Sequence, residues 1–447
     1  MNASSSKAGW SQVEITPSPG IFLGGRGMVL SEADAKKAPL LGQVVILEDP
    51  RGQRLVLASL DLIALGGPLC ATMQLRLACV AGVSPEAVIL NSSHTHSGPF
   101  AHYDESATLL PKPRNLIDYE LWLVDQMASA AGEALRHLAP ATVDRYLGEC
   151  HIGINRRRPG VDGQVAMGPN PEGVYNPELL LFDIVQPESG ARCLAFSHAC
   201  HPVIDVGWNR TLLSPDFPGE AREALKERFG SGIQVQFFQA ACGNVRPRLL
   251  SDFEKGSFRP SADGDARKIG QELAQAVEAT LRSEPQRLAL ELASVAGWAL
   301  VPKKMSVHLT REDFETMVEQ GGARGEAARY WLERGVGAQE LAAIVPWPVG
   351  IFSLAPDCRI AWFGGEPFAE WQAFLRRSLH DPGLIIWGYT GPSAGYLPCD
   401  EHLAEGGYEV SVVGPFRKTG PRPLGPGIDA AMATAFVQLK ERLACCG

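Results

Sequence analysis

The sequence lacks the apolar segments that direct a chain into or across a membrane. Its first residues, MNASSSKAGWSQVEITPSP, contain no apolar run of the kind that forms a secretory signal. Elsewhere, no uncharged apolar stretch reaches the roughly 20 residues that a transmembrane helix needs. We therefore expect a cytoplasmic protein that makes no stable association with membranes.

Basic tracts and aromatic RNA-binding motifs are also missing. The 447 residues carry a net charge of -9, and no predicted helix has a basic face. Proteins that bind nucleic acid neutralise phosphates with clustered Lys and Arg side chains, so this charge pattern argues against a nucleic-acid partner. We expect a small-molecule substrate instead, and the sequence leaves open whether the chain forms a homo-oligomer.

Cysteine pairs of the CxxC type are absent as well. The ten cysteines are scattered, no two of them form a CxxC pair, and most stand in apolar surroundings, as Cys70 and Cys193 do. This distribution argues against a cysteine-ligated zinc module and against a framework of disulfides. Buried, reduced thiols are the expected state.

What the sequence does contain is a strand and helix pattern that occurs three times. Residues 43–90, 178–238 and 351–390 are each predicted to form a hairpin, a helix and a further strand. Strands that alternate with helices favour an α/β fold with mixed sheets and flanking helices. Because ligands of such folds bind beyond the carboxyl ends of the strands, we expect the active site there.

A few segments lie outside this pattern. Residues 302–345 are predicted to be a helical insertion, and residues 98–117 a long loop beside the first predicted site residues. Apolar side chains at helical spacing predict further helices over 119–138 and 427–444.

Polar residues of chemical interest follow the predicted strands. The run NSSHTHSGPF contains His94 and His96, and side chains two apart on an extended chain point to one side, so both imidazoles can reach one site. His201 ends a hairpin of the second unit. Glu366 and Tyr396 follow glycines near the third, where the backbone can turn sharply. Imidazole and carboxylate groups are ligands of Zn²⁺, so the pattern indicates a metal site.

The motif SHTHSGP resembles the signature of the neutral/alkaline (non-lysosomal) ceramidase family, whose members are zinc-dependent amide hydrolases. Seven other segments resemble family motifs in the same order: AGWSQVEITPSPGIFLGG (8–25), GINRRRPG (153–160), FSHACHPVI (196–204), LSPDFPGEA (213–221), QAACGNVRP (239–247), GGEPFAEW (364–371) and AGYLPCDEHLAEGGYE (394–409). The resemblance implies that residues 1–447 form a single zinc-hydrolase catalytic domain, without the C-terminal β-sandwich of longer members.

The resemblance also implies roles for individual residues. The implied zinc ligands are His94, His201, Glu366 and Tyr396. His96 is the implied proton-transfer residue, and Arg156 and Tyr408 are implied to contact the substrate carbonyl and its oxyanion. The implied reaction is hydrolysis of an amide by water, activated by a Zn²⁺ ion that lowers its pKa to about 7.

The sequence departs from the family where GDVSP is replaced by GNVRP. Arg246 stands at the serine position and Asn244 at the aspartate position, so a mechanism that needs that serine is excluded. A cation there is consistent with an anionic group on the substrate or with a structural salt bridge. Together with the expected cytoplasmic location, this favours a small or amphiphilic amide over ceramide itself.

Other functions fit the same residues. A zinc-dependent esterase would use the same site, and a non-catalytic metal or ligand-binding homologue would need only part of it. Cys242, which follows a predicted strand and precedes a glycine, is the candidate nucleophile of a cysteine-dependent hydrolase. Asp61, at another strand end, is expected either to orient a ligand histidine or to cap a helix.

Overall fold

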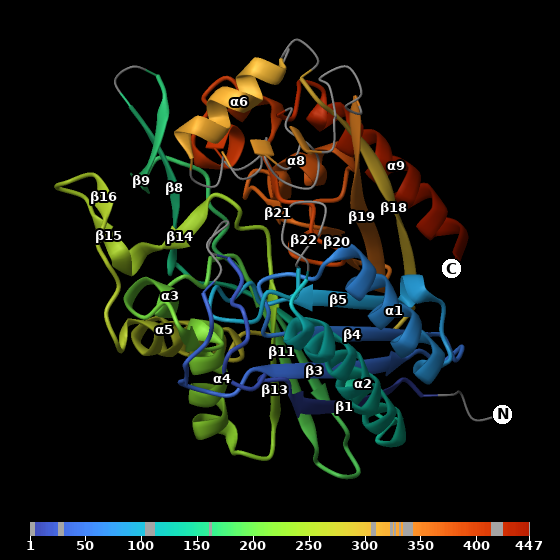
Figure 1. Ribbon diagram of the computed structural model, residues 1–447. Helices are drawn as coiled ribbons and strands as arrows, with labels where there is room; N and C mark the ends of the chain where they lie inside the picture. The colour runs from blue at the N-terminus through green and yellow to red at the C-terminus, as the bar shows by residue number, and fades with distance from the viewer. Residues whose placement is uncertain are drawn as a thin grey trace.

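The structure is a computed structural model that describes residues 5–25, 31–102, 112–160, 163–304, 310–321, 325, 328–329, 332–333, 343–412 and 423–446. Within these residues, three sheets have four or five strands each. Figure 1 shows helices on the outer sides of the sheets. The predicted α/β class with mixed sheets is confirmed.

Each large sheet contains one of the three predicted units. The first unit consists of β3 (Leu41–Glu48), β4 (Arg54–Leu60), α1 (Gly67–Ala81) and β5 (Val88–Ser92). The second consists of β10 (Glu178–Val185), β11 (Arg192–His198), α4 (Asp216–Phe229) and β13 (Gln234–Gln239). The third consists of β19 (Ile344–Ala355), β20 (Cys358–Phe363), α8 (Trp371–Ser378) and β22 (Ile385–Trp387).

The three units share one topology. In each, the first two strands form an antiparallel hairpin, and the strand after the helix pairs parallel to the second strand. The pairing Leu57↔Ile89 in the first sheet therefore corresponds to Phe196↔Phe237 in the second and to Ala361↔Ile386 in the third. The parallel pair thus has its carboxyl ends at one edge of each sheet.

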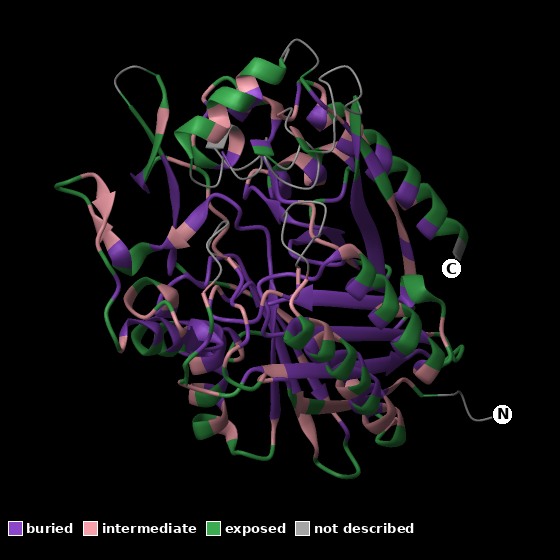
Figure 2. Ribbon diagram, viewed as in Figure 1, coloured by how far each residue is buried: buried purple, intermediate pink, exposed green. Residues whose placement is uncertain are grey.

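The central strands β3, β4, β5, β11 and β20 are mostly apolar because both of their faces are buried. On β4, Leu55 and Leu57 enter a core that all three sheets share, whereas Val56 and Ala58 face the helices. Within the shared core, Phe238 of β13 stacks on Trp387 of β22 with ring centroids 4.3 Å apart. Figure 2 shows these strands buried along their length, while the helices keep an exposed side.

Helices cover the outer face of each sheet. The first sheet packs against α1 and α2 (Arg114–Arg136), the second against α4 and α5 (Asp265–Thr280), and the third against α8 and α9 (Ile428–Cys446). The predicted helix over 427–444 thus corresponds to α9. The predicted helix over 119–138 is α2, which begins at Arg114, so the prediction of a loop as far as residue 117 was wrong.

The remaining strands extend the sheets or form small ones. Additional strands of the large sheets are β1 (Lys7–Glu14), β6 (Ala139–Pro140), β7 (Thr142–Glu149), β17 (Gln286–Arg287) and β18 (Ala293–Pro302). The small sheets comprise β8 (Gly153–Pro159), β9 (Val165–Asn170) and β14 (Val245–Pro247); β21 (Glu366–Pro367) and β23 (Tyr396–Leu397); β2 (Ala35–Lys36) and β12 (Leu212–Leu213); and β15 (Ser251–Asp252) and β16 (Ser257–Phe258).

Two further α-helices are short: α3 (Asp205–Trp208) and α6 (Arg311–Gln320). Single turns of 3₁₀-helix or π-helix are η1 (Pro85–Ala87), η2 (Arg248–Leu250), η4 (Asp400–Leu403) and η5 (Tyr408–Val412). The helix α6 lies within the predicted insertion, much of whose second half is outside the described residues. Part of the predicted loop beside the histidines, residues 103–111, is outside them too. In the described part of the chain, no helix has both the length and the apolar character to cross a membrane. The single-domain organisation stays a prediction.

Candidate metal centre

The carboxyl ends of β5, β13 and β22, one from each unit, meet around Asn91. Its Oδ1 accepts a hydrogen bond from Gln239 N at 2.8 Å, and its Nδ2 donates to Gly388 O at 2.9 Å and to Thr390 Oγ1 at 2.9 Å. Asn91 is fully buried. A single amide therefore connects three strand ends that are up to 299 residues apart in sequence, and His94 and His96 follow the first of these ends.

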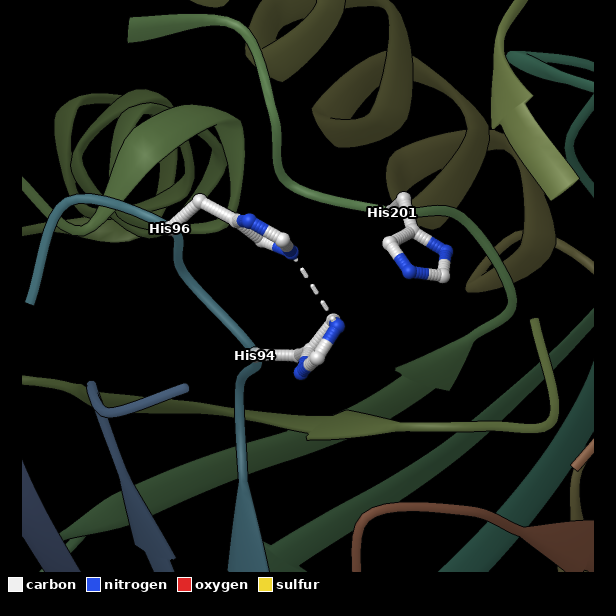
Figure 3. A group of neighbouring side chains, drawn as sticks. All are labelled: His94, His96 and His201. Atoms are coloured by element: carbon white, nitrogen blue, oxygen red, sulfur yellow. Dashed lines mark hydrogen bonds between the residues drawn. The ribbon is translucent and has the colours of Figure 1, made fainter. Parts of the chain in front are cut away.

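His94 and His96 leave the end of β5 side by side, but not for the reason the sequence suggested. The chain is not extended at His94, whose φ is 65°, in the left-handed region that costs a non-glycine residue about 1–3 kcal/mol. The two rings nevertheless meet edge to face, with centroids 4.8 Å apart. Figure 3 shows both rings, with His201 from the second unit facing them.

The loops that carry these histidines are held together by the backbone. His96 N donates to Pro202 O at 3.2 Å, and Ser214 N donates to Ser97 O at 2.9 Å. The buried hydroxyl of Thr95 donates to Ser214 O at 2.7 Å. The spacing between the imidazoles of the two loops is therefore fixed by the fold.

Hydrogen bonds to carbonyl groups set the tautomer of each ring. Nδ1 of His94 lies 2.7 Å from Ile63 O, that of His201 2.7 Å from Cys242 O, and that of His96 3.1 Å from Gly25 O. A carbonyl only accepts, so each Nδ1 carries a proton, and the lone pair of each neutral ring is then on Nε2. All three rings thus present acceptors to one another.

Glu366 completes this group of acceptors. Its Oε2 lies 3.4 Å from Nε2 of His94 and 3.3 Å from Nε2 of His201. Glu366 also pairs with Tyr396 in the parallel register of β21 and β23, so the two side chains leave the same face. The glycine before each has a φ near 95°: 94° at Gly365 and 96° at Gly395. The sharp turn predicted before Glu366 is present.

The donor set fits a divalent metal ion. Candidate ligand atoms of His94, His96 and His201 lie within 4.8 Å of one another. Two ligands about 2.0–2.1 Å from a tetrahedral zinc ion are about 3.3 Å apart, which matches the separations of Glu366 Oε2 from the two imidazoles. Burial lowers the pKa of His201 to about 3, and it also holds the pKa of His96 well below its ordinary value. Both rings are therefore neutral, as metal ligation requires.

Arg156 is the one of three consecutive arginines that contacts Tyr396. Its Nη2 donates to Tyr396 Oη at 3.1 Å and its Nε to Glu409 Oε1 at 2.8 Å, whereas Arg157 is bound to Glu405 and Glu409. Burial opposes the Arg156 charge, but Tyr396 and Glu409 keep its pKa well above the ordinary value.

Tyr408 completes the group of predicted site residues. Its ring centroid is 6.0 Å from that of Tyr396 and 5.9 Å from the Arg156 guanidinium carbon, and its side chain is partly exposed. The structure thus brings all seven predicted site residues into one region.

Cys242 has the wrong environment for a nucleophile. Its sulfur is fully buried, accepts from Gln239 Nε2 at 2.7 Å and lies 3.2 Å from Tyr389 Oη. Burial raises the pKa of the thiol to about 12, whereas a catalytic thiolate needs a lowered pKa. The carbonyl of Cys242 has a different task, which is to orient His201. These contacts disfavour the cysteine-dependent hydrolase.

Asp61 neither orients a histidine nor caps a helix, so both interpretations from the sequence were wrong. Its carboxylate is buried, receives two hydrogen bonds from Arg222 of α4 and accepts from Leu41 N at 2.9 Å. His94 is oriented by Ile63 O instead. Two other histidines are placed as follows: His198 faces Glu178 O away from the cluster, whereas His102 lines the pocket in front of it.

Sequence reasoning missed Tyr389, Asn91 and Glu409. Tyr389 has a φ of 53°, and its ring centroid lies 4.1 Å from that of His94. It lines a small pocket that also contains His94, His96, Glu366, Tyr396 and Tyr408. A buried polar residue within or just after an apolar strand, as in AVILN and LIIWGYT, was the signal available for Asn91 and Tyr389. Glu409, next to Tyr408, had no such signal.

Comparisons with known proteins establish the fold. No protein-family model and no curated protein matches the sequence. Among solved structures, neutral ceramidase from Pseudomonas aeruginosa matches with a TM-score of 0.72 and 18% identity, over 98% of this chain and 75% of that one. A ceramidase complexed with C2 matches with a TM-score of 0.72 and 20% identity, over 98% and 76% of the two chains. The chain therefore has the neutral ceramidase fold, as the sequence motifs predicted.

Proposed function

We propose that the protein is a zinc-dependent hydrolase of the ceramidase type that cleaves an amide bond. The observation that carries the proposal is the convergence of three imidazole Nε2 lone pairs and one carboxylate in a buried site. Acceptors gathered in this way repel one another unless a cation lies between them. The fold shared with two ceramidases supports amide hydrolysis as the reaction.

The ligands in this proposal are His94, His201, Glu366 and Tyr396. A zinc ion in this set would supply Lewis-acid activation of water at neutral pH. Carbonyl hydrogen bonds to Nδ1, as on His94 and His201, are the outer contacts that fix ligand histidines in metal sites. Tyr396 shares the register of Glu366, and its hydroxyl oxygen accepts a hydrogen bond from Arg156 Nη2, which leaves that oxygen a lone pair for a metal ion.

His96 would accept the proton of the attacking water and deliver it to the leaving nitrogen. It is the histidine of the cluster that is not fully buried, and it lines the pocket, so a substrate can reach it. Arg156 and Tyr408 would donate hydrogen bonds to the carbonyl oxygen as it becomes negative.

The surroundings of the pocket support a small or amphiphilic amide as the substrate. A groove of about 770 Å³, mostly apolar and lined by Trp298, Trp362 and Ile344 among others, shares Ser393 with the pocket. Its volume lies in the range of about 300–1,000 Å³ found for ligand sites. An acyl chain in this groove would place its amide carbonyl beside the histidines.

Hydrolysis of matched amides and esters tests the proposal. We expect release of amine from medium-chain N-acyl amides, loss of that activity after treatment with 1,10-phenanthroline, and recovery when zinc is added back. An enzyme that cleaves only the corresponding esters would be the zinc esterase. Amide cleavage that resists the chelator would contradict zinc dependence, and absence of turnover on both series would favour the non-catalytic homologue.

A further inference from the structure

Arg246 lies beside Arg156 on a small sheet at the edge of the candidate site. In the antiparallel pairing of β14 with β8, Arg246 is opposite Ile154, and Arg156 N donates to Asn244 O at 2.8 Å. Residues two apart on one strand share a face, so Arg246 and Arg156 leave the same face as diagonal neighbours. Such neighbours are about 7–8 Å apart, within reach of two long side chains.

The guanidinium of Arg246 has no carboxylate partner among the described residues. Its Nε is buried without a hydrogen-bond acceptor, and its Nη1 contacts only the weak acceptor Met167 Sδ, at 3.4 Å. Its carbon lies 5.0 Å from the centroid of the Phe258 ring. The planar guanidinium group, whose geometry suits a carboxylate, is therefore held in place with no carboxylate of the described residues bound to it.

The nearby carboxylates form their ion pairs with other arginines and not with Arg246. Glu409 binds Arg156 and Arg157 at 2.8 and 2.9 Å, and Glu405 binds Arg157 at 3.0 Å. Burial and the charge of Arg156 lower the pKa of Arg246 to about 10, so its guanidinium is still charged at neutral pH. The structural salt bridge that the sequence allowed at this position is not formed within the described part of the chain.

The charge of Arg246 also lies near residues of the pocket. Tyr396 and Tyr408, which line the pocket, act to raise the pKa of Arg246 against the effect of burial. A partly buried cation without a counter-ion is unfavourable, and an anion brought by a ligand removes that cost while gaining charge-assisted hydrogen bonds.

We propose that Arg246 binds a carboxylate of the substrate and so selects amides that carry an acidic group, such as N-acylated amino acids. The inference rests on the proposed amidohydrolase function, because the carboxylate and the scissile amide belong to one molecule. Arg246 is a specificity residue in this account, and the reacting atoms are served by His96, Arg156 and Tyr408.

Two substrates with the same acyl chain test the inference. N-dodecanoylglycine and N-dodecanoylethanolamine differ in having a carboxylate or a hydroxymethyl group. We expect the wild type to prefer the glycine conjugate. Arg246→Gln should lower kcat/KM for the glycine conjugate about 10- to 100-fold, mainly by raising KM, because charge-assisted hydrogen bonds to the carboxylate are lost. The ethanolamine conjugate should change less than about 3-fold, the size of a small environmental effect.

Two further variants control for charge and for folding. Arg248→Gln removes the same charge from an exposed residue two positions away and should leave the preference intact. Arg246→Lys keeps the positive charge but loses the bidentate geometry of the guanidinium, and it should retain part of the preference for the glycine conjugate. Thermal unfolding of each variant confirms that it is folded.

The outcomes separate this inference from the proposed function. If Arg246→Gln lowers kcat/KM equally for both substrates, or if the wild type prefers the ethanolamine conjugate, Arg246 is structural and the inference is overturned while amide hydrolysis stands. If neither compound is cleaved, calorimetry on the untreated wild type and on Arg246→Gln decides. Selective binding of the acid that depends on Arg246 supports the inference without hydrolysis, and equal or absent binding overturns it.

Discussion

His201→Ala protein is expected to be purified without zinc and to lose at least about 1,000-fold in amidase activity, because a metal supplies several kcal/mol of transition-state stabilisation. His201 is fully buried, and Glu366 Oε2 lies 3.3 Å from its Nε2. Its other nitrogen is fixed by Cys242 O, so the ring has one orientation. Metal content by plasma mass spectrometry and amine release are the two measurements.

His198→Ala is the matched control for this variant. His198 is buried near the end of the same hairpin, and its Nδ1 lies 3.1 Å from Glu178 O, away from the cluster. It should keep its zinc even if its melting temperature falls. Full zinc occupancy in His201→Ala would remove His201 from the ligands.

His96→Ala is expected to keep zinc and lose about 10²- to 10⁴-fold in kcat, the usual contribution of a general acid–base group. In this account His96 moves a proton, and the metal is held by other side chains. The measurements are zinc content and kcat on the same preparation. Thermal unfolding shows whether the variant is intact.

This variant also separates two roles that the geometry allows. Nε2 of His96 is 3.2 Å from Nε2 of His94, a separation that would suit a pair of ligands as well as a base beside a ligand. Loss of zinc from His96→Ala would make His96 a ligand and the proton-transfer assignment wrong. Retained zinc with unchanged kcat would contradict both roles.

The architecture could be predicted because its strands are buried on both faces and its units repeat. Apolar runs such as QVVIL and RLVLASL, separated by turns and followed by a helix, define a unit locally. Since a parallel pair has both carboxyl ends at one edge, His94, His201 and Glu366 were expected near strand ends before any contact was known. The family motifs then suggested which of these residues belong together.

Long-range contacts are what the sequence could not show. Arg156 is distinguished from Arg157 and Arg158 only by its contact with Tyr396, 240 residues away. The left-handed backbone of His94 is imposed by its surroundings, since its amide donates to Leu62 O and its ring to Ile63 O. The spacing of residues along the sequence cannot identify such distant partners. The same limit explains why Asp61 was assigned to the wrong task.

The central claim is that His94, His201, Glu366 and Tyr396 hold zinc. Its most direct test is the metal content of wild-type protein purified without a metal-affinity tag, measured by plasma mass spectrometry beside His94→Ala. The account predicts about one zinc per chain in the wild type, as expected for a single four-ligand site, and loss of that zinc in the variant. A wild-type protein that contains no metal, even after zinc is added back, would contradict it.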